Sequence, residues 1–306
     1  MANQHFATIG DIWKHLPLAE ILTIERPSKV WESHAGSAQY PLTYSWKREY
    51  GAYHFLKHAQ ESLPLAQSQY NAILQHLAST KDNKALFPGS PRLAMSLLGD
   101  RMQYLYCDLD WESLETIKVC ARELGVASEH VETVCAEGIA VLYERLLILD
   151  VNNALSVLAL LDPFDPFKHN EHGYNSIDLF RDLTARGVKA ALWYGFDSLT
   201  GNESETHSTS RAGRHEQLRR VLHIQEEDDP TLSNKLWCGE IFLKEIERLQ
   251  FRVNPSVLGC GFLCANLSSE SVRACELLAM GLVEIYQNSR LPGGSSGTLR
   301  FETVQF

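Results

Sequence analysis

The chain has 306 residues, 44% of them hydrophobic and 22% charged, and a formal net charge of −10. These values are ordinary for a globular protein with room for an α/β core, and they exclude a disordered or fibrous chain. The charge argues against a protein that coats nucleic acid non-specifically, which needs many Lys and Arg on one face, and the apolar stretches are too short for a membrane-spanning segment.

The first third of the chain is predicted to combine one strand with several helices. A helix is expected around residues 10–22 from the spacing of apolar side chains, and a short strand at 29–32. The strand runs into 33–38, a small-residue segment typical of turns that let backbone approach a ligand. Residues 47–80 are rich in helix formers without a strand pattern, which predicts an inserted helical subdomain. Ser90 is expected to be the N-cap of the next helix, with Pro91 at its first helical position.

The rest of the chain alternates strands with helices. The run 157–161 is wholly apolar, as expected of a central strand buried on both faces. The other strands expected in this part are 102–108, 131–135, 189–194, 260–266 and 298–305, and the helices are 111–124, 138–146, 178–186 and 271–287. The alternation predicts an α/β fold with a mostly parallel, doubly wound sheet, in a single domain over 1–306 with a helical insertion at about 47–80.

Acidic residues end or closely follow three of the predicted strands. Ligands of doubly wound sheets bind beyond the carboxyl ends of the strands, where segment 33–38, Asp108, Glu137 and Asp162 fall. A turn containing glycine and an acid at the end of a later strand form a minimal site for a nucleoside cofactor, since the acid accepts hydrogen bonds from ribose hydroxyls. The same turn is also compatible with a plain connection between strand and helix, so both interpretations stay open.

The segment 162–167, Asp-Pro-Phe-Asp-Pro-Phe, directly follows the apolar strand. Methyl transfer to an exocyclic amine needs an acceptor that orients the amine and an aromatic surface that holds the extruded base. Asp162 is the candidate acceptor, and Phe164 and Phe167 are the candidate substrate-binding residues. The alternative is a proline-rich loop in which the phenylalanines pack and Asp162 acts as a cap.

Basic residues gather between 207 and 223. This stretch holds Arg211, Arg214, His215, Arg219 and Arg220. A solvated loop and helix face is one interpretation, and a patch that contacts phosphates is the other.

Several motifs occur in order along nearly the whole chain. They are Lys14-His15, Ser33-His34-Ala35-Gly36, Pro88-Gly89-Ser90-Pro91, Asp108, Glu137-Gly138, Asp162-Pro163, Ala191-Leu192-Trp193-Tyr194 and Pro292-Gly293-Gly294. In order and spacing the chain resembles the ribosomal RNA large subunit methyltransferase J family. That family methylates N6 of an adenine in 23S ribosomal RNA, and was earlier described as involved in catabolism of external DNA.

The resemblance implies a Rossmann-like, S-adenosylmethionine-dependent methyltransferase that binds S-adenosyl-L-methionine and 23S ribosomal RNA. The residues themselves predict no metal, no membrane and no obligate protein partner, because no recognised metal-ligand spacing and no membrane-spanning apolar stretch occurs and the chain is long enough to bury its own core. Asp162 would be the catalytic acceptor of the target amine. The implied cofactor-binding residues are His15, His34, Ser90, Asp108, Glu137, Gly138 and Asp162. The seven cysteines include no C-x-x-C pair and read as reduced thiols, so a cytoplasmic location is expected.

The chain departs from the family in its catalytic motif. The family has Asp-Pro-Pro-Tyr where this chain has Asp162-Pro163-Phe164-Asp165, so a carboxylate takes the position of the stacking aromatic. Ala38 replaces a family glycine, which requires that its φ is not positive. These changes motivate an alternative, a catalytically drifted nucleic-acid-binding homologue. A DNA adenine methyltransferase, or a factor for the use of external DNA, is a third hypothesis that differs in substrate.

Overall fold

The computed structural model describes residues 6–79, 85–171, 173–200, 209–223, 235–243, 258–287 and 298–306. The Pro292-Gly293-Gly294 motif lies outside these residues, as do the first two residues of the basic stretch 207–223. Among the described helices, none has the length and apolar character that crossing a bilayer requires.

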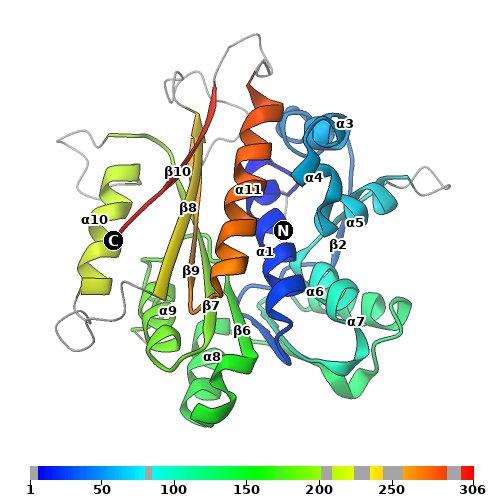
Figure 1. Cartoon of the computed structure of the whole chain (residues 1–306). Coiled ribbons are helices and arrows are strands. Elements are labelled where there is room, and N and C mark those ends of the chain that lie inside the picture. The colour runs from blue at the N-terminus through cyan, green and yellow to red at the C-terminus, as the bar shows by residue number, and fades with distance from the viewer. Residues whose placement is uncertain are drawn as a thin grey trace.

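Within the described ranges, eight strands form a sheet at the centre of the molecule (Figure 1). Its order is β5-β4-β1-β6-β7-β9-β8-β10. The first five strands pair in parallel, whereas β9 runs antiparallel to both β7 and β8, and β10 antiparallel to β8. The strands are β1 (Lys29–Glu32), β4 (Gln103–Asp108), β5 (Val131–Cys135), β6 (Val157–Leu161), β7 (Lys189–Phe196), β8 (Leu236–Leu243), β9 (Gly259–Ala265) and β10 (Leu299–Thr303).

The strand order reverses between β1 and β6. From β1 the chain builds outward through β4 and β5, then returns to pair β6 with the free side of β1 and builds the other way through β7. This reversal is the topological switch point, the place where ligands bind in open α/β sheets.

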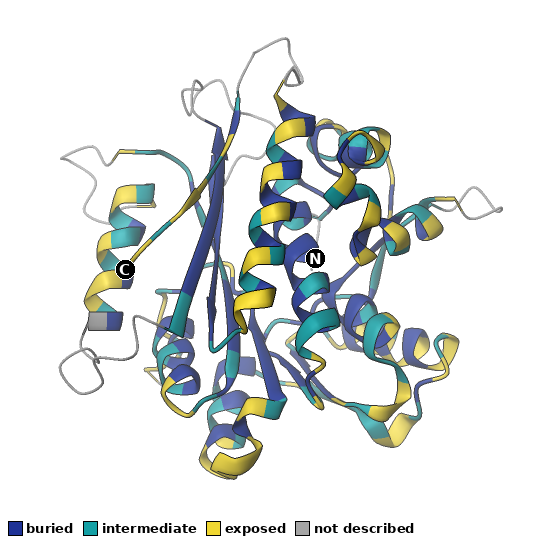
Figure 2. Cartoon of the chain, viewed as in Figure 1, coloured by how far each residue is buried: buried dark blue, intermediate teal, exposed yellow. Residues whose placement is uncertain are grey.

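Helices cover both faces of the sheet. The side chains of β6 alternate between the faces: Leu158 and Leu160 belong to one hydrophobic cluster, and Ala159 and Leu161 to the other. Because both faces are covered, β6 and β9 are buried along their whole length, and the helices carry exposed residues on their outer sides (Figure 2). On the first face lie α1 (Ile9–Glu25), α6 (Ser90–Leu98), α7 (Trp111–Glu123) and α11 (Ser269–Tyr286), and on the second α8 (Gly138–Leu147), α9 (Ser176–Ala185) and α10 (Arg211–His223).

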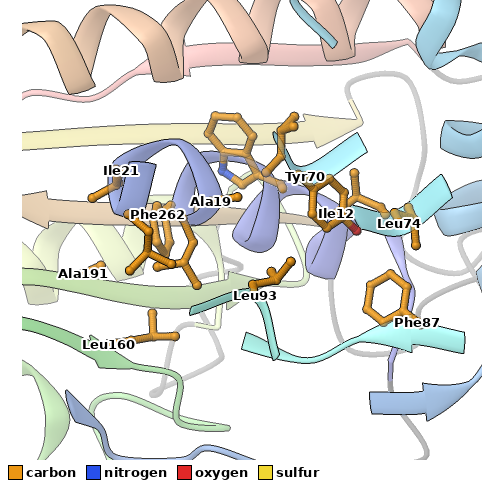
Figure 3. Packing of buried hydrophobic residues seen from close by; sticks show 14 of the residues in the cluster. Ile12, Ala19, Ile21, Tyr70, Leu74, Phe87, Leu93, Leu160, Ala191 and Phe262 are labelled. Carbon is orange, nitrogen blue, oxygen red and sulfur yellow. The ribbon is translucent and has the colours of Figure 1, made fainter. Parts of the chain in front are cut away.

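Helices also form the segment between residues 46 and 78. It contains α2 (Trp46–Arg48), a π-helical turn (Glu49–Tyr53), α3 (His54–His58), α4 (Leu63–Gln67) and α5 (Gln69–Ala78). Tyr70 and Leu74 of α5 lie beside Ile12 of α1, whereas Ile21 of α1 lies over Phe262 of the central sheet (Figure 3). The insertion and the sheet therefore share α1 as a common packing partner.

The predicted fold class is confirmed: a Rossmann-like, mostly parallel, doubly wound sheet with a helical insertion. Two further strands, β2 (Gln39–Pro41) and β3 (Leu86–Pro88), flank the insertion and pair antiparallel. They were not predicted because each has three residues and ends in proline, which reads as a break rather than a strand.

Candidate active site at the switch point

A cavity of about 620 Å³ opens at the carboxyl ends of the parallel strands. Its walls come from α1, the turn after β1, the ends of β4, β6 and β7, the start of α6, and α10. Six of the predicted site residues line it: His15, His34, Ser90, Asp108, Asp162 and Phe164. The volume falls within the roughly 300–1,000 Å³ that is usual for small-molecule and cofactor sites.

The turn after β1 is held by hydrogen bonds to its neighbours. Gly36 has a φ of 60°, which glycine adopts without steric cost, and its N–H donates to Asp108 Oδ2 at 2.8 Å. The backbone N–H of Ala38 donates to Thr116 Oγ1 at 2.9 Å, and the φ of Ala38 is not positive, so the family's glycine is not needed there. The turn is thus fixed against β4 and α7 with Asp108 at its centre.

Asp162 ends β6 beside a lysine of α1. Lys14 Nζ donates to Asp162 Oδ2 at 2.5 Å and lies 3.4 Å from Asp11 Oδ1. Burial raises the pKa of Asp162, and the charge and hydrogen bond of Lys14 oppose that rise. Burial by itself would lower the pKa of Lys14, but the charges of Asp162 and Asp11 outweigh it and raise this pKa, so Lys14 stays cationic.

Two histidines of the cavity are held neutral. Burial, reinforced by the charge of Lys14, lowers the pKa of His15 well below its usual value, and burial also lowers the pKa of His34. His34 Nδ1 lies 2.8 Å from Ser33 Oγ. His15 Nδ1 is buried without a hydrogen-bond partner among the described residues. The His15 ring lines the cavity, whereas its Nδ1 is closed off from solvent.

Ser90 contacts a second buried carboxyl group. Its Oγ donates to Glu32 Oε2 at 2.7 Å, and Glu32, at the end of β1, is only 1% exposed. Burial raises the pKa of Glu32 to about 8. A neutral Glu32 therefore underlies the cavity at neutral pH.

Glu137 and Gly138 do not line the cavity. The Glu137 carboxylate caps α8 by accepting from the N–H of Ile139 at 3.1 Å and of Ala140 at 2.9 Å, and it also accepts from Asn170 Nδ2 at 2.6 Å. A Cβ on Gly138 would come within 1.9 Å of the Ser33 carbonyl oxygen. The two residues hold α8 against the turn after β1, and their predicted contact with a cofactor stays a prediction.

The two candidate stacking residues differ in position. Phe164 stands at the rim of the cavity with 90% of its surface exposed. Phe167 does not line the cavity, and its ring centroid lies 4.8 Å from the guanidinium of Arg214. Between them in the chain, the Asp165 carboxylate accepts from Arg214 Nη1 at 3.1 Å. Phe164 therefore projects into solvent and Phe167 lies outside the cavity, so neither ring occupies the space beside Asp162.

No family model matches the chain, and neither does any curated protein. Among solved structures, protein LPL1258 of Legionella pneumophila, titled with the family model DUF519, is similar, with a TM-score of 0.71 at 17% identity over 98% of both chains. The two proteins share one fold.

Two methyltransferase structures resemble this chain more weakly than the Legionella protein does. A SAM-dependent methyltransferase from Agrobacterium tumefaciens has a TM-score of 0.40 at 10% identity, over 87% of this chain and 65% of that one. A putative O-methyltransferase from Klebsiella pneumoniae has a TM-score of 0.36 at 11% identity, over 83% and 80%.

Asp11, Lys14 and Glu32 were given no role from the sequence, and Arg214 was named only as part of the basic stretch 207–223. Lys14 and Asp11 act as one cluster because they lie one helical turn apart on α1, a spacing that the sequence does show. Glu32 and Arg214 have no such local signal, because their partners Ser90 and Asp165 lie 58 and 49 residues away.

Proposed function

We propose that the protein is an S-adenosylmethionine-dependent methyltransferase that methylates the N6 amine of adenine in ribosomal RNA. One observation carries this proposal: Asp162, at the end of the central strand β6, lines the same cavity as the Gly36 turn and Asp108, at the switch point of the sheet. The resemblance to the methyltransferase J family supports the choice of adenine and of ribosomal RNA.

The residues of the cavity fit the proposed cofactor. Asp108 has carboxylate lone pairs for ribose hydroxyls beyond the two that it uses for the N–H groups of Gly36 and Asp110. His15 lines the same cavity with a neutral imidazole ring. When bound, the cofactor supplies an electrophilic methyl group on a sulfonium.

The chain's own residues would position the amine. Lys14 engages Oδ2 of Asp162, and no described residue donates to Oδ1, which leaves that oxygen to accept an N–H of the target amine. A hydrogen bond to the half-buried carboxylate orients the nitrogen lone pair away from Asp162. When the nitrogen takes the methyl group it must lose one proton, and Oδ1 is the acceptor already in contact with it.

A second candidate function is that of a nucleic-acid-binding homologue without catalysis. The exposure of Phe164 favours it, because this side chain does not close over the cavity as a stacking residue would. Under this hypothesis the cavity keeps the cofactor or loses it, but no methyl group is transferred.

Transfer of labelled methyl groups from S-adenosylmethionine to deproteinised ribosomal RNA and to duplex DNA separates these functions. We expect incorporation into ribosomal RNA, found as N6-methyladenosine after digestion, and loss of at least about a hundredfold in Asp162→Asn, as for other groups that act in the transition state. Asp150→Asn is the matched control, because Asp150 caps the turn before β6, at the opposite end of that strand, and asparagine caps equally well. Undiminished transfer by Asp162→Asn would reject the proposed role, and incorporation only into DNA would reassign the substrate.

A further inference from the structure

An ion pair ties the loop after β6, residues 162–167, to helix α10. Asp165 Oδ1 accepts from Arg214 Nη1 at 3.1 Å and from the backbone N–H of Phe167 at 3.2 Å. The Arg214 side chain is only 8% exposed, and its guanidinium lies 4.8 Å from the ring centroid of Phe167. A charge-assisted hydrogen bond and a cation–π contact thus join the loop that begins at Asp162 to a helix from a distant part of the chain.

Helix α10 is itself anchored on the sheet. Arg211 Nε donates to Glu240 Oε2 at 2.5 Å, and His215 Nε2 lies 2.7 Å from Glu240 Oε1. Glu240 belongs to β8 and is fully buried. Removing its partners would leave a buried charge without compensation, so this contact holds α10 firmly in place. Arg214 therefore stands on a fixed support, and its pair with Asp165 passes that support on to the loop after β6.

The loop has little freedom between its two attachments. It begins at the end of β6, a strand whose residues are all buried. Pro163 and Pro166 fix the backbone φ at two positions of the loop. When Asp165 is held against α10, few torsions remain through which Asp162 could turn. Without the pair the loop would gain freedom, and Asp162 could leave Lys14, whose Nζ lies at 2.5 Å.

We infer that Arg214 and Asp165 are positioning residues, whose ion pair holds the loop after β6 so that Asp162 faces the target amine. The family that the chain resembles has its stacking aromatic at the position of Asp165, and here the side chain at that position is bound to α10 through Arg214. Both residues line the cavity, and they act on the reaction through Asp162 rather than by touching the substrate. The carboxylate of Asp165 thus serves the loop and is no sign that catalysis has been lost.

This inference rests on the proposed function, and its test compares four variants with the wild type. Asp165→Asn removes the negative charge of the pair, Arg214→Met removes the positive charge and keeps an apolar stem, and a double variant removes both. Glu132→Gln is the matched control. Glu132 lies on the edge strand β5, is likewise paired with an arginine, Arg145, and does not line the cavity.

The first arm measures hydrogen exchange of the loop after β6 by mass spectrometry, which needs neither cofactor nor RNA. We expect its amides to exchange at least about threefold faster in Asp165→Asn and in Arg214→Met than in the wild type, because a hydrogen bond between charged groups is about twice as strong as a neutral one. Glu132→Gln should leave this exchange unchanged. Equal exchange in Asp165→Asn and the wild type would overturn the inference, even if Arg214→Met does not fold.

The second arm measures kcat and KM for methyl transfer to deproteinised ribosomal RNA. We expect kcat to fall at least about tenfold in each single variant while KM for the RNA stays within about twofold, because a misplaced Asp162 affects the transition state and not the binding of RNA. The double variant should lose no more than either single variant, since each of them already breaks the pair. Glu132→Gln should match the wild type.

Distinct outcomes would overturn the two ideas. If the wild type transfers no methyl group, the proposed function fails, and the positioning role fails with it, whatever the exchange of the loop. If the wild type is active and kcat is unchanged in Asp165→Asn, the proposed function stands and the positioning role is wrong. A raised KM with an unchanged kcat would mean that Asp165 contacts the RNA directly. Losses that multiply in the double variant would mean that the two residues act independently, and either of these results also rejects the inference.

Discussion

Lys14 and burial act on Asp162 in opposite directions. Burial raises the pKa of Asp162 because a carboxylate is poorly solvated there, and the cation of Lys14 at 2.5 Å favours the charged form. A carboxylate that accepts a hydrogen bond from an amine must be charged to do so well. Lys14 thus acts on the proposed reaction through Asp162, by keeping it ionised.

Replacing Lys14 with methionine removes the effect that opposes burial. The pKa of Asp162 then rises further, so a larger share of the group is protonated at any given pH below its new value. We expect the acidic limb of the profile of kcat/KM against pH to move to higher pH, with a greater loss at pH 6 than at pH 9. A profile that is lower by the same factor at every pH would show that Lys14 does not act through Asp162.

Glu32 makes the stability of the fold depend on pH. Its pKa is about 8 in the folded chain and near 4.5 without the fold, so the folded state holds the proton more tightly. The stabilisation is complete below pH 4.5 and is lost as the pH rises toward 8. Glu32→Gln removes this loss. We expect the free energy of unfolding of Glu32→Gln, relative to the wild type, to be higher at pH 8 than at pH 5 by at least about 1 kcal/mol. Urea unfolding at both values measures it, and an equal difference at both values would contradict the assignment.

At the scale of elements, the contact between α8 and the turn after β1 sets the shape of the site. The first residue of α8 is Gly138, and an added Cβ would lie 1.9 Å from the Ser33 carbonyl oxygen, a distance that only a shift of backbone can relieve. The same turn carries His34 and Gly36, so such a shift would reach the cavity.

Gly138→Ala tests this contact. We expect it to lower the free energy of unfolding by about 1–3 kcal/mol, as overpacking does, and to weaken binding of S-adenosylhomocysteine. Gly10→Ala is the control, because Gly10 also lies in the first turn of a helix and an added Cβ there meets only ordinary contacts, at 3.6 Å or more. Alanine is the better helix former, so Gly10→Ala should be neutral or stabilising. Equal stability of the two variants would show that the close approach is not needed.

The sequence predicted the elements better than the contacts between them. The apolar run 157–161 marked the central strand, and its end marked Asp162 as a residue of the ligand-binding edge. Contacts between residues far apart in the chain leave no local pattern in the sequence. Lys14, for example, binds Asp162, which lies 148 residues away. Glu137 follows a strand as Asp108 does, yet it caps its own helix, because a carboxylate before a helix satisfies the N–H groups of the first turn.

At the scale of the whole molecule, the fold gathers segments that are far apart in the sequence around one cavity. The lining residues range from Phe6, near the start of the chain, to Arg214 on α10. The order of strands explains this gathering, since β1 and β6 are neighbours although the chain between them builds the far half of the sheet. The basic stretch on α10 is partly used inside the molecule: Arg211 pairs with Glu240 at 2.5 Å and Arg214 with Asp165, whereas Arg219 and Arg220 are exposed. Arg219 and Arg220 are thus the arginines of this stretch that stay exposed on α10.

The central claim, that this cavity holds S-adenosylmethionine, is tested most directly by calorimetric titration with S-adenosylhomocysteine. The account predicts one equivalent bound by the wild type and by Asp150→Asn. Asp108→Asn should bind at least about tenfold more weakly, because a charged acceptor for ribose hydroxyls is replaced by a neutral one. No detectable binding by the wild type, or equal affinity in Asp108→Asn, would contradict it.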